Sequence, residues 1–249
     1  MSLIELLLLG LAAMAAGAVN ALAGGGSILT FPALVAAGLP PLAANITNSV
    51  ALCPGYVGGV FAQRHDLKGQ ARRVLLLTPV AVAGGFGGAL LILNSSEALF
   101  RALVPWLLLG GCALLAVQDR LRAWLQQRTG SVGLGWAMLP VGLGAVYGGY
   151  FGAGLGVIFL AVLGLAIDDG LIRLNALKQT LSLGTNVSAA ALLVLSPQMV
   201  WSAGSIMGAG AIVGGTIGGR LAGAIRPALL RAIVIVIGVA VAIVFLVRG

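Results

Sequence analysis

The chain has 249 residues, of which 60% are hydrophobic and only 8% are charged, and its formal net charge is +8. About a quarter of the residues in a soluble domain are charged, so this composition excludes an ordinary soluble protein and predicts a polytopic helical membrane protein. The cations fall mainly in loops between apolar segments. They are therefore expected to anchor loops at a lipid bilayer, and no nucleic-acid partner is expected.

The first half contains one apolar run that breaks at glycines, followed by three longer segments. The run over 3–23 ends at Gly24-Gly25-Gly26-Ser27, and a shorter run over 28–38 follows it. Apolar segments of about 20 residues match the hydrocarbon core of a bilayer. Full spans are therefore expected over 43–62, 74–93 and 99–117, joined by a basic loop at 64–73 and a turn at 94–97.

The longest polar stretch, 118–131, divides the chain. It is expected to be a cytoplasmic linker between a first repeat, 1–117, and a second repeat, 132–249, within one integral membrane domain. In the second half an apolar run over 134–150 meets the sequence Gly152-Ala153-Gly154-Leu155-Gly156, and a short run over 157–167 follows. Spans are then expected over 174–195, 201–222 and 229–247.

The second half repeats the first at a fixed offset. The separation between Gly84–Gly88 and Gly214–Gly218 is the same as the separation between Asn45 and Asn175. Glycine-rich helices match by chance more easily than most, but one offset kept over many positions indicates an internal repeat.

The distribution of cations predicts that the two halves have opposite orientations. Twelve of the 14 Lys and Arg follow the positive-inside rule if four groups are cytoplasmic: Arg64, Lys68, Arg72 and Arg73; Arg120, Arg122 and Arg128; Arg173 and Lys178; and Arg220, Arg226 and Arg231. Equivalent loops then lie on opposite sides, and both termini lie outside. The halves are therefore interpreted as inverted repeats.

This topology requires 134–167 to enter and leave the membrane on one side, and 3–38 to do the same from the other side. About 35 residues are too few for two full spans and a turn. The predicted fold class is an all-α polytopic membrane protein with two inverted-topology repeats. Each repeat consists of a helical hairpin with one short arm, broken at a Gly-rich turn, plus three transmembrane helices.

The glycine-rich turns are candidate binding elements. Gly24, Gly25 and Gly26 cannot continue a good helix, since each costs about 1 kcal/mol relative to Ala. A helix break at membrane depth exposes backbone groups that only protein or a wet cavity satisfies, and in transporters such breaks mark substrate sites. The alternative is close helix packing, which glycine also permits. Recurrence of the pattern at Gly152 and Gly154 favours the break.

Polar clusters recur near both breaks. On a helix, Asn45, Asn48 and Ser49 lie on one face, at i, i+3 and i+4. At the repeat offset, the same face carries Asn175, Lys178 and Gln179. These clusters either form hydrogen bonds between helices or line a shared central site. Lys178 favours the site, because intramembrane cations are costly and usually functional, although its long side chain could also reach the cytoplasmic interface.

The residue types available in the spans favour an anion. Acidic residues occur only near the ends of spans, whereas Lys178, amides and the helix N-termini at Ser27 and Leu155 offer positive charge and N–H groups. With two Cys and one His, no metal site or other cofactor is expected. No nucleophile–base–acid set is present in the spans, so the sequence predicts no enzyme.

The sequence resembles a known family. Asn20 to Ser27, Phe31-Pro32 and Ala44 to Ser49 are similar to motifs of the sulfite exporter TauE/SafE family of bacterial membrane permeases. The likeness covers the whole chain in length and two-half organisation, and its first-half motif is the specific part. The resemblance implies transport of sulfur-containing anions, such as sulfite or organosulfonates, across the bacterial inner membrane.

The sequence thus favours a secondary transporter for a small anionic substrate that works by alternating access. No P-loop is present, so ATP is not expected to drive it directly. An anion channel and a structural or assembly subunit of a membrane complex remain as alternatives. Oligomeric state and transport direction are not encoded in any residue pattern.

Overall fold

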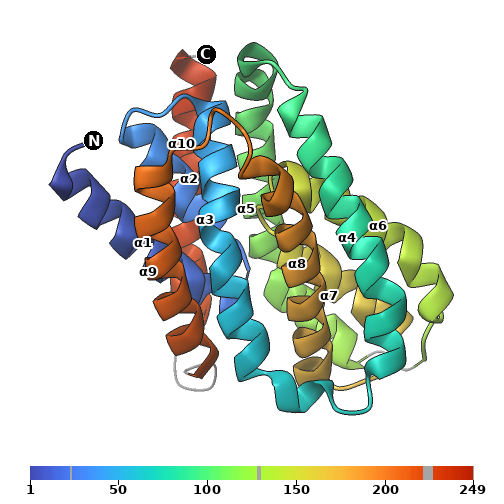
Figure 1. The fold of residues 1–249 in the computed structure, drawn as a ribbon. Helices are drawn as coiled ribbons and strands as arrows, with labels where there is room; N and C mark the ends of the chain where they lie inside the picture. The colour runs from blue at the N-terminus through green and yellow to red at the C-terminus, as the bar shows by residue number, and fades with distance from the viewer. Residues whose placement is uncertain (23, 128–129, 221–226, 249) are drawn as a thin grey trace.

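A computed structural model describes residues 1–22, 24–127, 130–220 and 227–248. Over these ranges the chain forms ten α-helices and one short 3-10 helix, η1 (Figure 1). In chain order the elements are α1 (Leu3–Leu22), α2 (Ser27–Ala36), α3 (Pro41–Ala62), η1 (Arg64–Leu67), α4 (Ala71–Leu93), α5 (Glu97–Gln127), α6 (Leu134–Tyr150), α7 (Leu155–Ala166), α8 (Leu171–Leu193), α9 (Trp201–Arg220) and α10 (Pro227–Arg248).

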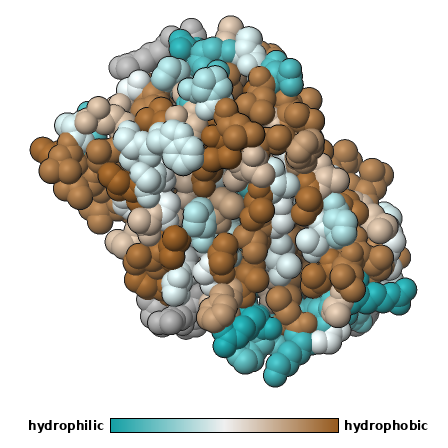
Figure 2. All heavy atoms as spheres, in the orientation of Figure 1, coloured by the Kyte–Doolittle hydropathy of each residue, from teal (hydrophilic) through white to brown (hydrophobic). Residues whose placement is uncertain are grey.

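The all-helical fold with two short arms is confirmed. The arms are α2, with 10 residues, and α7, with 12 residues, and each follows a glycine-rich turn. Within the described residues, three helices are long and apolar enough to cross a membrane by length and composition: α1, α4 and α5. Hydrophobic side chains cover the flanks of the molecule, and hydrophilic ones gather toward its two ends (Figure 2). This distribution is suited to a lipid environment.

Helix α5 continues ten residues beyond the expected span, so the first ten residues of the polar stretch 118–131 are helical. This segment contains no glycine or proline that would end a helix. Leu125 is buried against α7, where a Cβ on Gly164 would lie 2.6 Å from Leu125 Cδ1. The stretch is therefore amphipathic, with an apolar side that packs on the short arm.

The helices of the two halves pack against each other rather than forming separate bundles. α1 packs on α9, α6 packs on α4, and α3 and α8 contact each other. Glycines allow these close approaches: a Cβ on Gly17 would lie 2.8 Å from Gly215 N, and one on Gly84 would lie 2.6 Å from Gly142 O. The interior is therefore shared by both halves.

Both termini lie toward the upper end of Figure 1, and the connection between α3 and α4 lies at the lower end. The α4–α5 and α8–α9 connections also lie at the upper end. Arg128 and Arg226, which are predicted to lie in cytoplasmic connections, are outside the described residues. The sidedness of the membrane topology stays a prediction.

Candidate functional site

The first break joins α1 to α2 through glycines in a left-handed backbone conformation. Gly24 has φ +78° and Gly25 has φ +99°, values that side-chain-bearing residues rarely adopt. The break is held by two hydrogen bonds: Gly24 N donates to Val19 O (3.0 Å), and Gly26 N donates to Asn20 Oδ1 (2.7 Å). Ser27 is buried at the first position of α2.

Asn20 is a structural residue of the break that sequence reasoning did not select. Its amide lies one turn before the glycines and accepts the N–H of Gly26 at a buried position. The available signal was a lone Asn near the end of an otherwise apolar run, four residues before the first glycine of the triplet. Polar side chains that satisfy freed backbone groups are expected at such a break.

The second break joins α6 to α7 and is built in the same way. Gly152 (φ +79°) and Gly154 (φ +77°) have left-handed backbone conformations, and Gly152 N donates to Tyr147 O (3.2 Å). The hydroxyl of Tyr147 donates to Ala153 O (2.6 Å). The Tyr147 side chain therefore stabilises this break by a hydrogen bond to the backbone, as the Asn20 side chain stabilises the first.

The two breaks meet. A Cβ on Gly24 would lie 3.3 Å from Gly156 Cα, so the backbones are in contact. A Cβ on Gly156 would lie 3.6 Å from Lys178 Nζ. The structure therefore brings Lys178 of α8 to the point where the two glycine turns touch and the short arms α2 and α7 begin.

The side-chain amine of Lys178 is buried and has no polar partner within the described ranges. Only 1% of the residue is exposed, and Nζ has no hydrogen-bond partner among the described residues. It lies beside Gly156, not at the solvent-exposed end of α8. Helix N-termini carry partial positive charge, so those of α2 and α7 add to the positive potential here. Among the described residues, no three His, Cys, Asp or Glu side chains gather as metal ligands would.

Two amides on α3 lie in different environments. Asn45 is fully buried, and its Nδ2 donates to Tyr150 O (2.9 Å), the last residue of α6. Asn45 therefore holds the second break from the opposite half. Asn48, one turn further along α3, is 1% exposed, and neither of its amide atoms has a partner in the described part of the chain. Asn48 thus keeps hydrogen-bonding capacity for a ligand.

The other predicted site residues have partners elsewhere. Ser49 Oγ donates to Asn45 O within α3 (2.9 Å). Asn175 Nδ2 donates to Gln63 Oε1 (2.7 Å), at the end of α3. Gln179 is buried against α3, where a Cβ on Gly59 would lie 2.7 Å from its Nε2. Asn175 and Gln179 therefore connect α8 to α3.

A model of the family described as sulfite exporter TauE/SafE matches residues 9–245, nearly the whole chain. The chain belongs to this family. TauE/SafE proteins are membrane transporters, not enzymes, and the chain is accordingly a multi-pass membrane protein.

The relatives are distant and carry general names. The "Probable membrane transporter protein YfcA" of Escherichia coli (strain K12) is 28% identical over 203 residues, which cover 81% of this chain and 75% of that protein. The "Probable membrane transporter protein ORF9" of a Sinorhizobium species is 27% identical over 239 residues, which cover 93% of this chain and 88% of that protein. A "Probable membrane transporter protein" of Haemophilus influenzae is 30% identical over 200 residues, which cover 79% of this chain and 76% of that protein. No solved structure matches the chain significantly.

Proposed function

We propose that the chain is a secondary transporter that moves a small sulfur-containing oxyanion, such as sulfite or an organosulfonate, across the bacterial inner membrane by alternating access. The substrate site is placed at the contact between the two glycine breaks. The observation that carries the proposal is the buried, unpartnered Lys178 amine beside Gly156, at the N-termini of two short helices.

The chemistry of the contact point suits an anion. An isolated ammonium in an apolar interior is costly unless an opposite charge accompanies it. N–H groups at helix N-termini bind oxyanions, and the glycines let the backbone approach a ligand closely. In the proposed site Gly24 to Ser27, Gly152 and Gly154 form the backbone cradle. Asn48 donates a further hydrogen bond, while Asn45, Ser49, Asn175 and Gln179 support the surrounding helices.

The packing of the helices supports an inverted repeat. α1 packs on α9 as α6 packs on α4, and α3 contacts α9 as α8 contacts α4. The first residues of α3, α4 and α5 precede those of α8, α9 and α10 by one constant offset, the same that separates Asn45 from Asn175. We infer two repeats, 1–117 and 132–249, that move against each other around the breaks, which is how inverted-repeat transporters expose a central site to either side.

The test is anion binding to the purified protein and to Lys178→Gln. Thermal unfolding is followed with sulfite, sulfate, thiosulfate, sulfoacetate and taurine, because a ligand of the folded state raises its stability. We expect Lys178→Gln to weaken anion binding at least about thirtyfold, or about 2 kcal/mol. The unliganded variant should be no less stable than the parent, since an uncompensated buried charge has been removed.

Arg120→Gln is the matched control, because Arg120 is an exposed cation on α5. It should bind and transport like the parent. Saturable counterflow in proteoliposomes separates the transporter from a channel, which would give conductance instead. If none of the anions stabilises the parent, the proposed function is wrong; if Lys178→Gln binds as tightly as the parent, the placement of the site is wrong.

A further inference from the structure

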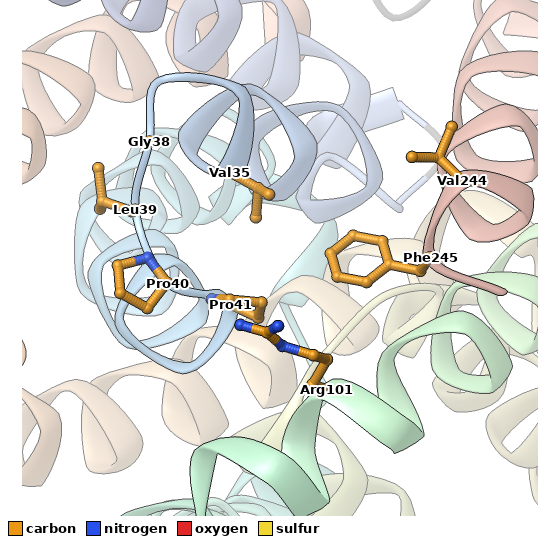
Figure 3. A pocket seen from close by; sticks show the side chains of 8 residues that line it. All are labelled: Val35, Gly38, Leu39, Pro40, Pro41, Arg101, Val244 and Phe245. Atoms are coloured by element: carbon orange, nitrogen blue, oxygen red, sulfur yellow. The ribbon is translucent and has the colours of Figure 1, made fainter. Parts of the chain in front are cut away.

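A cavity of about 460 Å³ opens at the end of the molecule where α2 gives way to α3 (Figure 3). Its walls are the connection Gly38–Pro41, Val35 of α2, and Val244 and Phe245 of α10, and Arg101 of α5 completes it. The volume is in the range of small-molecule sites. The lining combines mostly apolar groups with one cation.

Arg101 is available to a ligand. Its guanidinium extends from α5 toward Pro41 (Figure 3), and the side chain is about half exposed (53%). Its ion pair with Glu97 is long, with 4.0 Å between Arg101 Nη2 and Glu97 Oε1. Glu97 also accepts the backbone N–H of Leu42 (3.2 Å) at the start of α3. Because a guanidinium has five N–H donors, Arg101 retains several for an incoming acidic group.

Packed aromatic rings separate this cavity from the glycine breaks. Phe245, on the cavity wall, stacks on Phe31 of α2 at 6.3 Å between ring centroids. Phe31 in turn contacts Phe151, directly after α6, at 5.6 Å. The cavity and the Lys178 site are therefore two places, connected through the short arm α2.

We propose that this cavity is a second, outer binding site for an organic anion with one acidic head group and a short hydrocarbon tail. The head group pairs with Arg101, and the tail contacts Phe245, Val244 and Val35. A compact inorganic oxyanion leaves the apolar walls unused and binds weakly. The choice of a sulfonate as the head group rests on the proposed function, whereas the geometry requires only an acid and an apolar tail.

The experiment titrates methane-, propane- and hexanesulfonate into Lys178→Gln protein in nanodiscs of zwitterionic lipid, so that binding to the central site is weakened. We expect the affinity to rise about fourfold per methylene until the cavity is filled. Arg101→Gln in the same background should lower the affinity for all three ligands at least tenfold. Phe245→Ala should reduce the dependence of the affinity on chain length. Val244→Ala, at an exposed position, replaces Phe245→Ala if that variant does not fold.

Arg120→Gln in the Lys178→Gln background is the control and should change nothing. The proposal of an outer site would be overturned if Arg101→Gln left the affinities of the Lys178→Gln protein unchanged. It would also be overturned if Lys178→Gln alone abolished all sulfonate binding. Nanodiscs with anionic lipid test whether a lipid head group, rather than a soluble anion, occupies the cavity. Competition by that lipid would identify a lipid head group as the occupant and overturn the assignment to a soluble anion. Failure of the proposed function is distinguishable, because the proposed function is tested by anion binding to the parent that depends on Lys178, whereas the outer site is tested without Lys178 and depends on Arg101.

Discussion

A substitution at Gly156 can reduce the space at the proposed central site without changing the charge of that site. A Cβ there would lie 3.5 Å from both Gly24 Cα and Lys178 Cδ, which is ordinary contact. Ala is favoured over Gly inside a helix by about 0.5–1 kcal/mol. We therefore predict that Gly156→Ala keeps or raises the unfolding temperature and weakens anion binding at least about tenfold, measured by titration and thermal unfolding. Unchanged binding would place the anion elsewhere.

Gly25 is a poorer position for this purpose. Its φ of +99° disfavours any side chain, and a Cβ there would lie 2.7 Å from Leu115 Cδ1 on α5. A larger residue at Gly25 would therefore strain the fold as well as the break. Loss of transport in such a variant would not separate folding from binding.

Asn45 and Asn48 should respond to mutation in opposite ways. Asn45→Ala removes a buried hydrogen bond to Tyr150 O, so we predict a loss of about 1–3 kcal/mol of stability. Asn48→Ala removes no hydrogen bond within the described residues, so stability should hold while anion binding falls about fivefold, the equivalent of one neutral hydrogen bond. Chemical denaturation and anion titration of both variants check this pair. A destabilised Asn48→Ala with normal binding would make Asn48 a packing residue.

At the scale of elements, an ionic cluster ties α4 to α8. The Asp169 carboxylate, in the connection before α8, pairs with Arg73 of α4 and with Arg173 of α8. Arg173 Nη1 also donates to Lys68 O (3.0 Å), and buried Gln70 Nε2 donates to Arg173 O (3.0 Å). This cluster joins the first half to the second at the end of the molecule where α3 and α4 connect.

The cluster predicts a pH dependence of stability. Partial burial raises the pKa of Asp169, but hydrogen bonds from Arg73 and Arg173 outweigh this and hold its pKa below the ordinary value. A carboxylate with a lowered folded pKa stabilises the protein above its unfolded pKa, near 4, and loses this contribution as pH falls through the folded pKa.

We therefore expect Asp169→Asn to lower stability by about 1 kcal/mol at pH 7, a modest value because the pair is partly exposed. The difference from the parent should shrink below about pH 4. Thermal unfolding of both proteins between neutral and acidic pH measures this. A difference that stays constant with pH would exclude the carboxylate charge as its cause.

At the scale of the whole molecule, the proposed inverted repeat makes a prediction about sidedness. The charge distribution places both termini outside and the 64–73 and 118–131 segments in the cytoplasm. A C-terminal fusion should therefore activate a periplasmic reporter and leave a cytoplasmic one silent, and a reporter inserted near residue 68 should do the opposite. The inverse pattern at either position would contradict the proposed relation between the halves.

The sequence predicted the parts of the fold that depend on local physics. Clustered glycines and short apolar runs located both breaks and both short arms, because helix interruption and span length follow from neighbouring residues. Contacts between the halves were not predictable. Helical spacing grouped Asn175 with Lys178, yet Asn175 pairs with Gln63, whereas Lys178 reaches Gly156. Such choices depend on which helix of the other half lies opposite, and residue periodicity within one helix carries no information about that.

Lys178 also has an electrical consequence for the proposed mechanism. Among the described residues no carboxylate neutralises it. When Lys178 is protonated and crosses the membrane field together with a singly charged substrate, the pair has no net charge and the transmembrane voltage does no work on it. A doubly charged substrate leaves one negative charge, worth about 2.3 kcal/mol per 100 mV. The valence of the substrate therefore determines whether the loaded step carries current and whether the resting voltage of the cell favours one direction of it.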